Sequence, residues 1–491
     1  MTAADAMKQG WEGTPLPFSQ IPGPQWPIVG ALPTFLSCGG VDKMEDYYKY
    51  LYNTYGPVVN TSILGDKSVM ITDPREMRKV FAHEGKYPKS IANDIFSVNY
   101  AAKKHGMEPA TISQSGEVWL KGRHALQKDL FAREATSSYV RLMTTACDEV
   151  TEAWQARIAA GESLDFNKAI QDAVADIFSN VIFGTTMQIS RGACSADDAE
   201  WQRASIAMLQ SIVRILQQPW IRFWPEAFST FRTFETNYVS TIKQGRRKVL
   251  ETLENYKDFD GPEEETPWLL KLNRRGDFDL DGVVRESANL VFAGLDTTSI
   301  AMSWLLINLA QHPEAQQTLR EEFLRVLGPD VKFTWEKMKD LPYTKAVWRE
   351  TNRFTPMGLL TGSRTLDVDL PLCGYVIPAG TRIDMATVVQ QDPQVVDDPE
   401  VFRPERFFQE VVETRKNDPL KSLVDHRLIS TPFGFGARMC LGSRLAETEI
   451  FLLLSQLITK FKFEAPPGKV GRKLGVMMMP DPFPTVRITP I

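Results

Sequence analysis

One apolar stretch, residues 281–311, constrains the fold of this chain more than any other feature. It contains the run ANLVFAGLDTTSIAMSWLLINLA and ends just before Pro313, which cannot continue a helix. The pattern predicts one long helix, and at about 1.5 Å per residue its roughly 30 residues span ~45 Å. Such a helix must cross the interior of a domain with most of its faces buried. No run approaches the ~20 uninterrupted apolar residues that a membrane span needs.

Most of the remaining chain also has helical periodicity, and strand patterns are few. We expect helices within residues 114–159, 169–183 and 201–255, and a further amphipathic helix directly after residue 442. Strand patterns occupy residues 58–71, 368–383 and 476–488, and the polar residues 258–265 predict a loop. No internal repeat or linker divides the 491 residues. The predicted fold class is mainly α with small β-sheets (α+β), in a single large domain.

Net charge and cysteine usage exclude several classes of protein. The formal net charge of −5 gives no electrostatic support for nucleic-acid binding. The five cysteines are scattered, odd in number and without a CxxC spacing. This pattern argues against a disulfide framework or a zinc site, and it favours a reducing compartment.

The N-terminal residues resemble neither a secretory signal nor a transit peptide, because they are neither apolar nor rich in arginine. We expect residues 1–20 to be a poorly ordered leader or remnant, with a native leader either absent or removed, and residues 21–491 to form the catalytic domain. Residues 15–30 contain five prolines and are therefore stiff and extended. They could lie on a membrane surface or simply lead the chain onto the globule.

The strongest chemical signal is PFGFGARMCLG, residues 432–442, in which three glycines surround Cys440. Glycines permit a tight turn and let the loop lie flat against a planar group. A cysteine placed just before a helix has its thiolate stabilised by the first N–H groups and the helix dipole. Arg438 adds a positive charge suited to an anion. These features predict a thiolate site at Cys440 rather than an inert buried thiol.

The same segment resembles the haem-binding loop of cytochromes P450, Phe-x-x-Gly-x-Arg-x-Cys-x-Gly, at Phe433, Gly436, Arg438, Cys440 and Gly442. This resemblance implies that Cys440 is the metal ligand, a thiolate on the iron of haem b, with the other four residues binding the cofactor. It also implies O2 as co-substrate and electrons from NADPH through a redox partner.

A second motif lies in the long helix, at residues 293–298 (AGLDTT). Glycine weakens a helix by ~1 kcal/mol relative to alanine, and a threonine hydroxyl can bond back to the carbonyl four residues earlier and bend the helix. Beside the cysteine loop, this segment resembles the P450 oxygen-activating motif, where the helix widens locally. The resemblance implies that Thr297 holds bound oxygen and that Asp296 relays protons.

A third motif pairs Glu350 with Arg353, one helical turn apart, and Arg406 follows in the segment PERF at residues 404–407. In P450s the corresponding Glu and two Arg residues form a buried structural network behind the haem. The resemblance therefore assigns Glu350, Arg353 and Arg406 to the support of the cysteine loop.

Three further residues are predicted to bind the haem. Trp119 and Arg123 have the i, i+4 spacing that places both on one helix face, and the matching pair in P450s contacts a haem propionate. A surface Trp–Arg stack is the alternative. Arg364 is a further propionate ligand, although it lies one residue farther from Arg353 than the family pattern.

The subfamily resemblance is to mitochondrial-type, ferredoxin-dependent sterol and steroid hydroxylases, and it covers residues 20–490. Lys345 and Arg349 are four apart and would form a positive stripe for an acidic ferredoxin. That branch usually has two arginines after Cys-x-Gly, whereas here Ser443 replaces the first and only Arg444 remains. The resemblance implies that Lys345, Arg349 and Arg444 contact the redox partner, which is either a ferredoxin or a flavoprotein reductase. The alternative is that Lys345 and Arg349 are ordinary solvated residues.

By position in the family, the substrate pocket draws on residues 91–107, 206–223 and 477–479 together with single positions in three other segments. Most of these side chains are apolar, and methionine adapts to irregular ligands, which favours a large lipid such as a sterol. The pocket residues are Phe96, Asn289, Phe292, Ala293, Leu359, Leu360, Met477 and Met478.

The predicted function is that of a cytochrome P450 monooxygenase acting on a sterol-like lipid, by hydroxylation or by stepwise methyl oxidation or demethylation. Two alternatives are a P450-fold hydroperoxide isomerase or peroxygenase, against which Thr297 argues, and a non-catalytic haem-thiolate ligand-binding protein. We expect an intracellular, membrane-associated enzyme with peripheral membrane contact, at the mitochondrial inner membrane or the endoplasmic reticulum, and no nucleic-acid partner.

Overall fold

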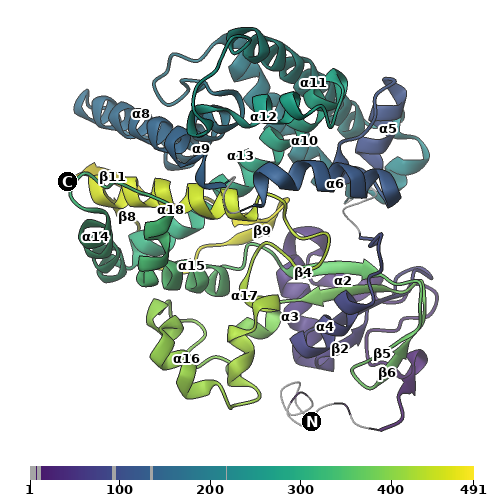
Figure 1. Ribbon diagram of the computed structural model, residues 1–491. Helices are drawn as coiled ribbons and strands as arrows, with labels where there is room; N and C mark the ends of the chain where they lie inside the picture. The colour runs from purple at the N-terminus through teal and green to yellow at the C-terminus, as the bar shows by residue number, and fades with distance from the viewer. Residues whose placement is uncertain (1–6, 8–10, 12, 91–94, 133–135, 217) are drawn as a thin grey trace. The chain divides into compact units, whose positions relative to one another are not determined.

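The chain folds into two units, each assembled from segments that are distant in sequence. A computed structural model describes residues 7, 11, 13–90, 95–132, 136–216 and 218–491 (Figure 1). The first unit, here called the sheet unit, comprises Met1–Asn93, Lys345–Cys440 and Gly471–Asp481. The second, here called the helical unit, comprises Asp94–Thr344, Leu441–Val470 and Pro482–Ile491. Ten residues of the predicted leader, 1–6, 8–10 and 12, lie outside the described residues, whereas residues 13–20 are described and include Leu16–Pro17, which form strand β1.

A mixed four-stranded sheet organises the sheet unit, in the order β2-β3-β7-β4. Strands β3 and β7 run parallel, whereas the other two pairings are antiparallel. The first hairpin confirms the strand pattern predicted at residues 58–71, with the turn at Gly65 in a left-handed conformation (φ 90°). The bounds are β2 Val58–Asn60, β3 Ser68–Ile71, β4 Leu360–Thr365 and β7 Arg382–Ala386.

Two smaller sheets complete the strands of this unit. Strand β1 (Leu16–Pro17) pairs with β6 (Tyr375–Ile377), which forms a hairpin with β5 (Leu370–Leu372), as predicted for residues 368–383. The β segment predicted at residues 476–488 contains one strand and the start of another, and each belongs to a different sheet. Strand β10 (Met478–Pro480) pairs with β9 (Arg472–Leu474), whereas β11 (Arg487–Pro490) belongs to the helical unit.

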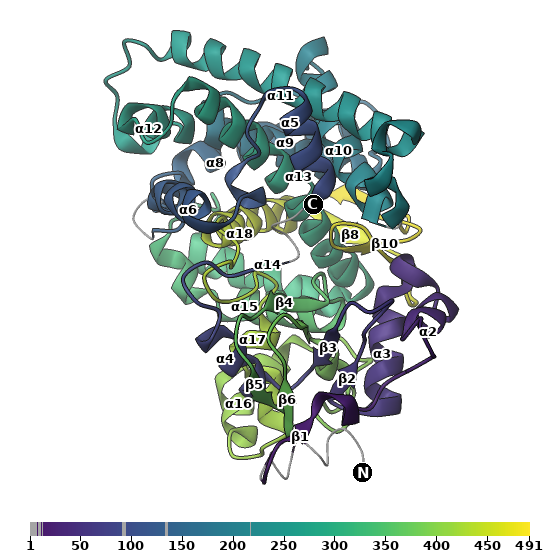
Figure 2. The ribbon, with the colours of Figure 1, turned by 90° about the vertical axis from the view of Figure 1, so that its right-hand side faces the viewer.

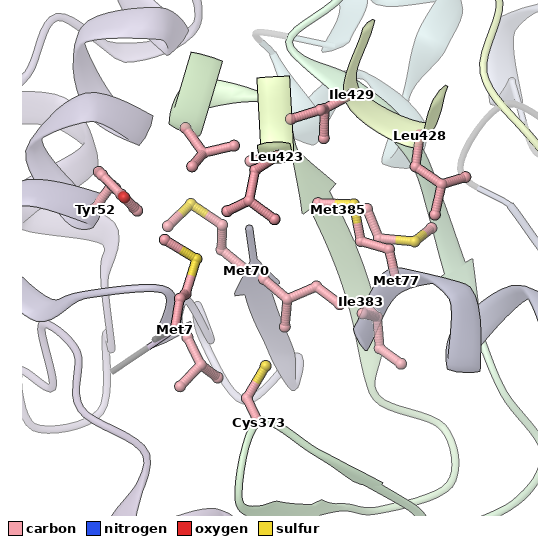
Figure 3. Packing of buried hydrophobic residues seen from close by; sticks show 14 of the residues in the cluster. Met7, Tyr52, Met70, Met77, Cys373, Ile383, Met385, Leu423, Leu428 and Ile429 are labelled. Atoms are coloured by element: carbon pink, nitrogen blue, oxygen red, sulfur yellow. The ribbon is translucent and has the colours of Figure 1, made fainter. Parts of the chain in front are cut away.

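A single apolar core holds the sheet unit together (Figure 3). Met70 on β3 and Met385 on β7 are fully buried beside Leu428 and Ile429, which come from a helix more than 40 residues farther along the chain. Methionine fills irregular gaps between elements that meet at uneven angles. The helices around this core are α2 Leu32–Ser37, α3 Met44–Tyr55, α4 Pro74–Ala82, α15 Pro342–Phe354, α16 Gln409–Arg415 and α17 Arg427–Ser430, with short 3-10 turns at Phe18–Gln20, Gly40–Lys43, Val388–Gln391, Pro404–Phe407 and Lys421–Asp425.

The long helix α13 (Leu280–Gln311) is the axis of the helical unit and confirms the prediction for residues 281–311. It begins where the Asp279 carboxylate accepts a hydrogen bond from the Gly282 N–H (2.8 Å), and it ends before Pro313. Among the described residues, α13 is the one helix long and apolar enough to cross a membrane, but its apolar window is 71% buried. It is therefore a core helix of a folded unit.

Helices α10 (Ala196–Leu216) and α11 (Ser229–Asn255) also belong to the helical unit and pack against each other (Figures 1 and 2). The sequence predicts helix throughout residues 201–255, but prolines at positions 219 and 225 interrupt it, and two 3-10 turns replace the helix there. The other helices of the helical unit are α5 Phe96–Lys104, α6 Gly116–Leu130, α8 Val140–Ala159, α9 Phe166–Phe183, α12 Trp268–Arg275, α14 Pro313–Leu327 and α18 Ser443–Lys460. Strand β8 (Phe461–Glu464) pairs with β11. Short 3-10 turns lie at Thr111–Ser113, Pro219–Phe223, Pro225–Ala227, Glu263–Glu265 and Glu336–Asp340.

These elements confirm the predicted fold class, mainly α with small sheets. The predicted loop at residues 258–265 is irregular except for the 3-10 turn Glu263–Glu265. The helix expected after residue 442 is α18, which begins at Ser443 with Gly442 as its N-cap residue.

Candidate haem-thiolate site

The cysteine loop is a tight turn that ends with an accessible thiol. The Cys440 N–H donates to the Phe433 carbonyl (2.9 Å), which closes the loop on itself. Gly434 (φ 69°) and Gly436 (φ 79°) both adopt left-handed conformations that favour glycine. A Cβ at Gly436 would stand 2.6 Å from Glu84 Oε1 and 2.7 Å from the Phe81 ring, so any larger residue would displace the loop.

Cys440 differs from the other four cysteines in exposure, and all five lie in the described part of the chain. Its residue is exposed, whereas Cys147 and Cys373 are buried, and Cys38 and Cys194 are half-buried. Burial raises the pKa of the Cys147 and Cys373 thiols, and it raises that of Cys194 to about 11, which keeps them protonated. A thiol in an exposed residue at the end of this glycine loop is of the kind that would bind a haem iron.

Arg364 on β4 and Arg438 in the loop, both predicted to bind a propionate, lie in the same unit as Cys440. The Arg364 guanidinium is 2% exposed, donates to Glu84 Oε2 (2.6 Å) and to the Phe435 carbonyl (3.1 Å), and stands 5.1 Å from the centre of the Phe81 ring. Arg438 Nε donates to the Pro88 carbonyl (3.2 Å). Both cations are therefore fixed by protein contacts, and Glu84 is a partner that the sequence motifs did not indicate.

Glu350, Arg353 and Arg406 meet as the resemblance implied, and we call them the carboxylate–arginine triad. Arg353 donates to Glu350 through Nε and Nη2 (2.8 Å each), and Arg406 Nε adds a third contact (3.1 Å). Arg353 and Arg406 also donate to the carbonyl oxygen of Val401. The Glu350 and Arg353 side chains are fully buried. The triad thus joins α15 to the segment that contains the PERF turn.

The triad reaches the cysteine loop through aromatic packing. Trp348, on α15 two residues before Glu350, lies against Phe433 of the loop with ring centroids 6.2 Å apart. A displaced α15 would therefore shift the residue whose carbonyl accepts from the Cys440 N–H.

The Ala293–Thr298 motif lies in α13 of the helical unit. The Thr297 hydroxyl donates to the Ala293 carbonyl (2.7 Å), which is the back-bond that its sequence position predicts. The resemblance implied that the helix widens locally at this motif. In the structure, every residue of α13 is α-helical, and the helix is not interrupted there. Gly294 has a packing role, because a Cβ there would lie 2.6 Å from the ring of Phe178 on α9.

Asp296 on α13 is half-buried, and its carboxyl has a raised pKa. Burial raises this pKa to about 6, because the carboxylate loses part of its hydration. A carboxyl with a pKa near the working pH can both accept and release a proton.

Helix α6 carries Trp119, which is buried, and Arg123, which is half-buried, one turn apart on the same face. A contact that the motifs did not indicate links α13 to the 3-10 turn before α6, and this turn packs on the middle of α6. Glu286 on α13, which is 1% exposed, accepts from the Thr111 N–H (3.1 Å) and hydroxyl (3.0 Å). Thr111 in turn packs on Gly122 of α6, where a Cβ would stand 2.4 Å from its hydroxyl oxygen. A glycine in mid-helix was the one sequence signal for this contact.

The predicted pocket residues fall in both units and are described in each separately. In the sheet unit, Leu359, Leu360 and Met477 are half-buried. Met478 is buried, and its N–H donates a hydrogen bond to the Met357 carbonyl (2.9 Å). In the helical unit, Phe96, Asn289 and Ala293 are half-buried. The side chain of Phe292 lies outside the described residues, as do residues 91–94 and 217 of the predicted pocket ranges.

The predicted redox-partner residues have different surroundings. Lys345 on α15 is exposed. Arg349 Nη2 contacts Asp425 Oδ1 (3.2 Å), and its guanidinium stands 4.2 Å from the centre of the Phe407 ring. In the helical unit, Arg444 stands 5.1 Å from the Phe131 ring. The charge of Arg349 is therefore partly compensated within the chain, which weakens the predicted positive stripe on α15.

Comparison with known proteins agrees with this geometry. The family model "Cytochrome P450" matches residues 21–484. Similar proteins include "Cytochrome P450 10" of Lymnaea stagnalis, 27% identical over 95% of this chain and 84% of that protein. The mitochondrial cholesterol side-chain cleavage enzyme of Equus caballus is 26% identical over 95% of this chain and 88% of that protein. The mitochondrial sterol 26-hydroxylase of Homo sapiens is 25% identical over 87% of this chain and 81% of that protein.

Proposed function

Because this chain belongs to the cytochrome P450 family and is a haem-dependent monooxygenase, we propose that its substrate is a sterol or a steroid. The observation that carries the proposed site is the accessible Cys440 thiol, at the end of a loop that its glycines and the Trp348–Phe433 contact hold in shape. In this proposal the Cys440 thiolate would bind the iron of haem b, and Arg364, Arg438, Trp119 and Arg123 would hold its propionates.

The haem, when bound, supplies an iron centre that activates O2 with electrons delivered one at a time, and the chain supplies the proton path. We assign proton exchange to Asp296, whose pKa of about 6 lets it cycle near neutral pH. We assign the Thr297 hydroxyl, which donates to the Ala293 carbonyl one turn earlier on α13, to the same proton path. Thr297 therefore supports a monooxygenase over a hydroperoxide isomerase or peroxygenase.

The sterol assignment is supported by the relatives and by the side chains. Two of the similar proteins are named for action on cholesterol or a sterol. The proposed pocket residues of the sheet unit, Leu359, Leu360, Met477 and Met478, are apolar and deformable. Asn289, half-buried on α13, is the one amide among the proposed pocket residues and suits a sterol hydroxyl.

The electron donor is proposed to be a ferredoxin that receives its electrons from NADPH through a reductase. Several similar proteins are named as mitochondrial, and Lys345 is exposed on α15 as a docking charge. A flavoprotein reductase is the competing donor, because Ser443 stands where the ferredoxin-dependent branch has an arginine.

Peripheral membrane contact is proposed through exposed apolar side chains at the end of α10 and in and beside the 3-10 turn Pro219–Phe223. Leu216, Trp220, Phe223 and Trp224 are 62%, 52%, 68% and 70% exposed. Tryptophan and phenylalanine side chains at this density suit the boundary between lipid headgroups and acyl chains. We propose the mitochondrial inner membrane as the location, with the endoplasmic reticulum as the alternative that goes with a flavoprotein reductase.

One set of incubations tests the proposed substrate and donor. Purified haem-loaded protein is first screened against a sterol panel for shifts in the haem absorption spectrum. Each sterol that causes a shift is then incubated with NADPH and ferredoxin plus its reductase, with NADPH and a flavoprotein reductase, or with peroxide alone. We expect an oxidised sterol in the ferredoxin arm. Product in the peroxide arm alone would refute the monooxygenase assignment, and no spectral shift with any sterol would refute the substrate class.

A further inference from the structure

Glu84 lies where the end of α4, strand β4 and the cysteine loop meet in the sheet unit. It follows the last residue of α4 by two positions, and its side chain is only 9% exposed. Oε2 accepts from Arg364 Nε (2.6 Å), and Oε1 accepts from the main-chain N–H of Ala437 (2.7 Å). One carboxylate thus joins the proposed propionate ligand of β4 to the loop that presents Cys440.

Close packing reinforces this junction. The Gly436 backbone approaches Glu84 so tightly that a Cβ would collide with Oε1 at 2.6 Å. Phe81, on the last turn of α4, packs edge-on against Phe435 of the loop with ring centroids 5.2 Å apart. The loop is therefore held against α4 by both a carboxylate and a ring.

We propose that Glu84 is a positioning residue for the haem-thiolate site. Its carboxylate holds the cysteine loop and the Arg364 guanidinium in one fixed geometry. The inference rests on the proposed roles of Cys440 and Arg364. A guanidinium has five N–H donors, and Arg364 directs three of them to Glu84, Phe435 and Ser363. Two remain for an anionic ligand such as a propionate, so Glu84 orients this cation without occupying all of its donors.

The chemistry of the junction requires two acceptors. Both partners of Glu84 are donors, a guanidinium N–H and a peptide N–H, and a carboxylate can accept from each. Glutamine has the same shape but only one oxygen, so its NH2 group must face a donor. Glu84→Gln therefore breaks one contact with little change in volume. Glu84→Asp keeps both acceptors on a shorter stem and is the conservative variant.

The first measurement is hydrogen exchange of the peptide that contains residues 433–440, in haem-free and haem-loaded protein. We expect the Ala437 amide to exchange about 10-fold faster or more in Glu84→Gln, because it loses a charge-assisted hydrogen bond, and Glu84→Asp to lie between it and the original protein. Glu413→Gln is the matched control, since Glu413 is an exposed partner of Lys416 in the same unit. It should exchange like the original protein.

The second measurement is the fraction of the reduced carbon-monoxide complex that shows the thiolate-type absorption band. We expect this fraction to fall in Glu84→Gln, to recover in part in Glu84→Asp and to stay unchanged in Glu413→Gln. Exchange within two-fold of the original protein, or faster exchange with an unchanged thiolate fraction, would overturn the role of Glu84. The absence of the thiolate band in the original protein would instead refute the proposed function, and the exchange of Ala437 would still report on Glu84.

Discussion

Replacing Glu350 by alanine removes the carboxylate at the centre of the carboxylate–arginine triad. Glu350 accepts hydrogen bonds from Arg353 Nε and Nη2, from Arg406 Nε and from the Arg403 N–H, and the Arg353 side chain is fully buried. Glu350→Ala leaves two guanidinium groups without their counter-ion, and burial already lowers the pKa of Arg406. Water cannot enter to solvate them without opening the contact between α15 and the PERF turn.

Breaking a buried ion pair by removing one partner costs about 3–5 kcal/mol. The unfolding free energy of a typical native protein is about 5–15 kcal/mol, so this change removes a large share of it. The matched control is Glu413→Ala, because an exposed pair such as Glu413–Lys416 contributes about 0–1 kcal/mol. Glu350→Gln keeps the volume and one acceptor and should fall between the two.

The assay measures haem per chain after purification, together with the midpoint of denaturant unfolding. We expect Glu350→Ala to lose most of its haem and to unfold at markedly lower denaturant, and Glu413→Ala to match the original protein in both. A Glu350→Ala protein with full haem content and an unchanged midpoint would refute the structural role of the triad.

Three other predictions concern polar side chains of the helical unit. Thr297→Ala should retain haem but form less product per electron consumed, measured as the ratio of product to NADPH; an unchanged ratio would contradict a role in proton delivery. Asp296→Asn removes a carboxyl with a pKa of about 6, so that ratio should become independent of pH between about 5 and 7, whereas a retained dependence would assign the titration to another group. Burial raises the pKa of Glu449 on α18 from 4.5 to about 8, so the folded state keeps a proton that the unfolded state releases. The contribution of Glu449 to the unfolding free energy should therefore be largest below pH 4.5 and fall by up to ~1.4 kcal/mol per unit as the pH rises to about 8. Calorimetry across this range should show it as a pH-dependent difference in unfolding free energy between the original protein and Glu449→Gln, and a constant difference would contradict it.

The sequence predicted the elements whose limits are set by neighbouring residues. The bounds of α13 follow from the Asp279 cap and from Pro313, both of which act within one turn of the helix. The residues of the triad were found because their spacing forms a motif. Residues 201–255 were less well predicted, because helical periodicity continues across the prolines that separate α10 from α11.

Contacts between distant segments could not be predicted in this way. Strand periodicity at the C-terminus identified extended segments, but it did not indicate that β10 pairs with β9 while β11 pairs with β8. Glu84 was missed because its partners, Arg364 and Ala437, are 280 and 353 residues away. In the sequence His83-Glu84-Gly85 it has the local pattern of an exposed turn. Arg349 was predicted as a docking charge from its spacing to Lys345. That spacing could not indicate the ion pair with Asp425, which lies far away in the sequence.

The central claim is that Cys440 is the thiolate ligand of the haem, and the absorption spectrum of the reduced carbon-monoxide complex tests it most directly. The original protein and Cys194→Ser, a control at a half-buried thiol, should both show the thiolate-type band. Cys440→Ser should lack it, whether or not haem is retained. A thiolate-type band that persists in Cys440→Ser, or its absence from the original protein with haem bound, would contradict the assignment.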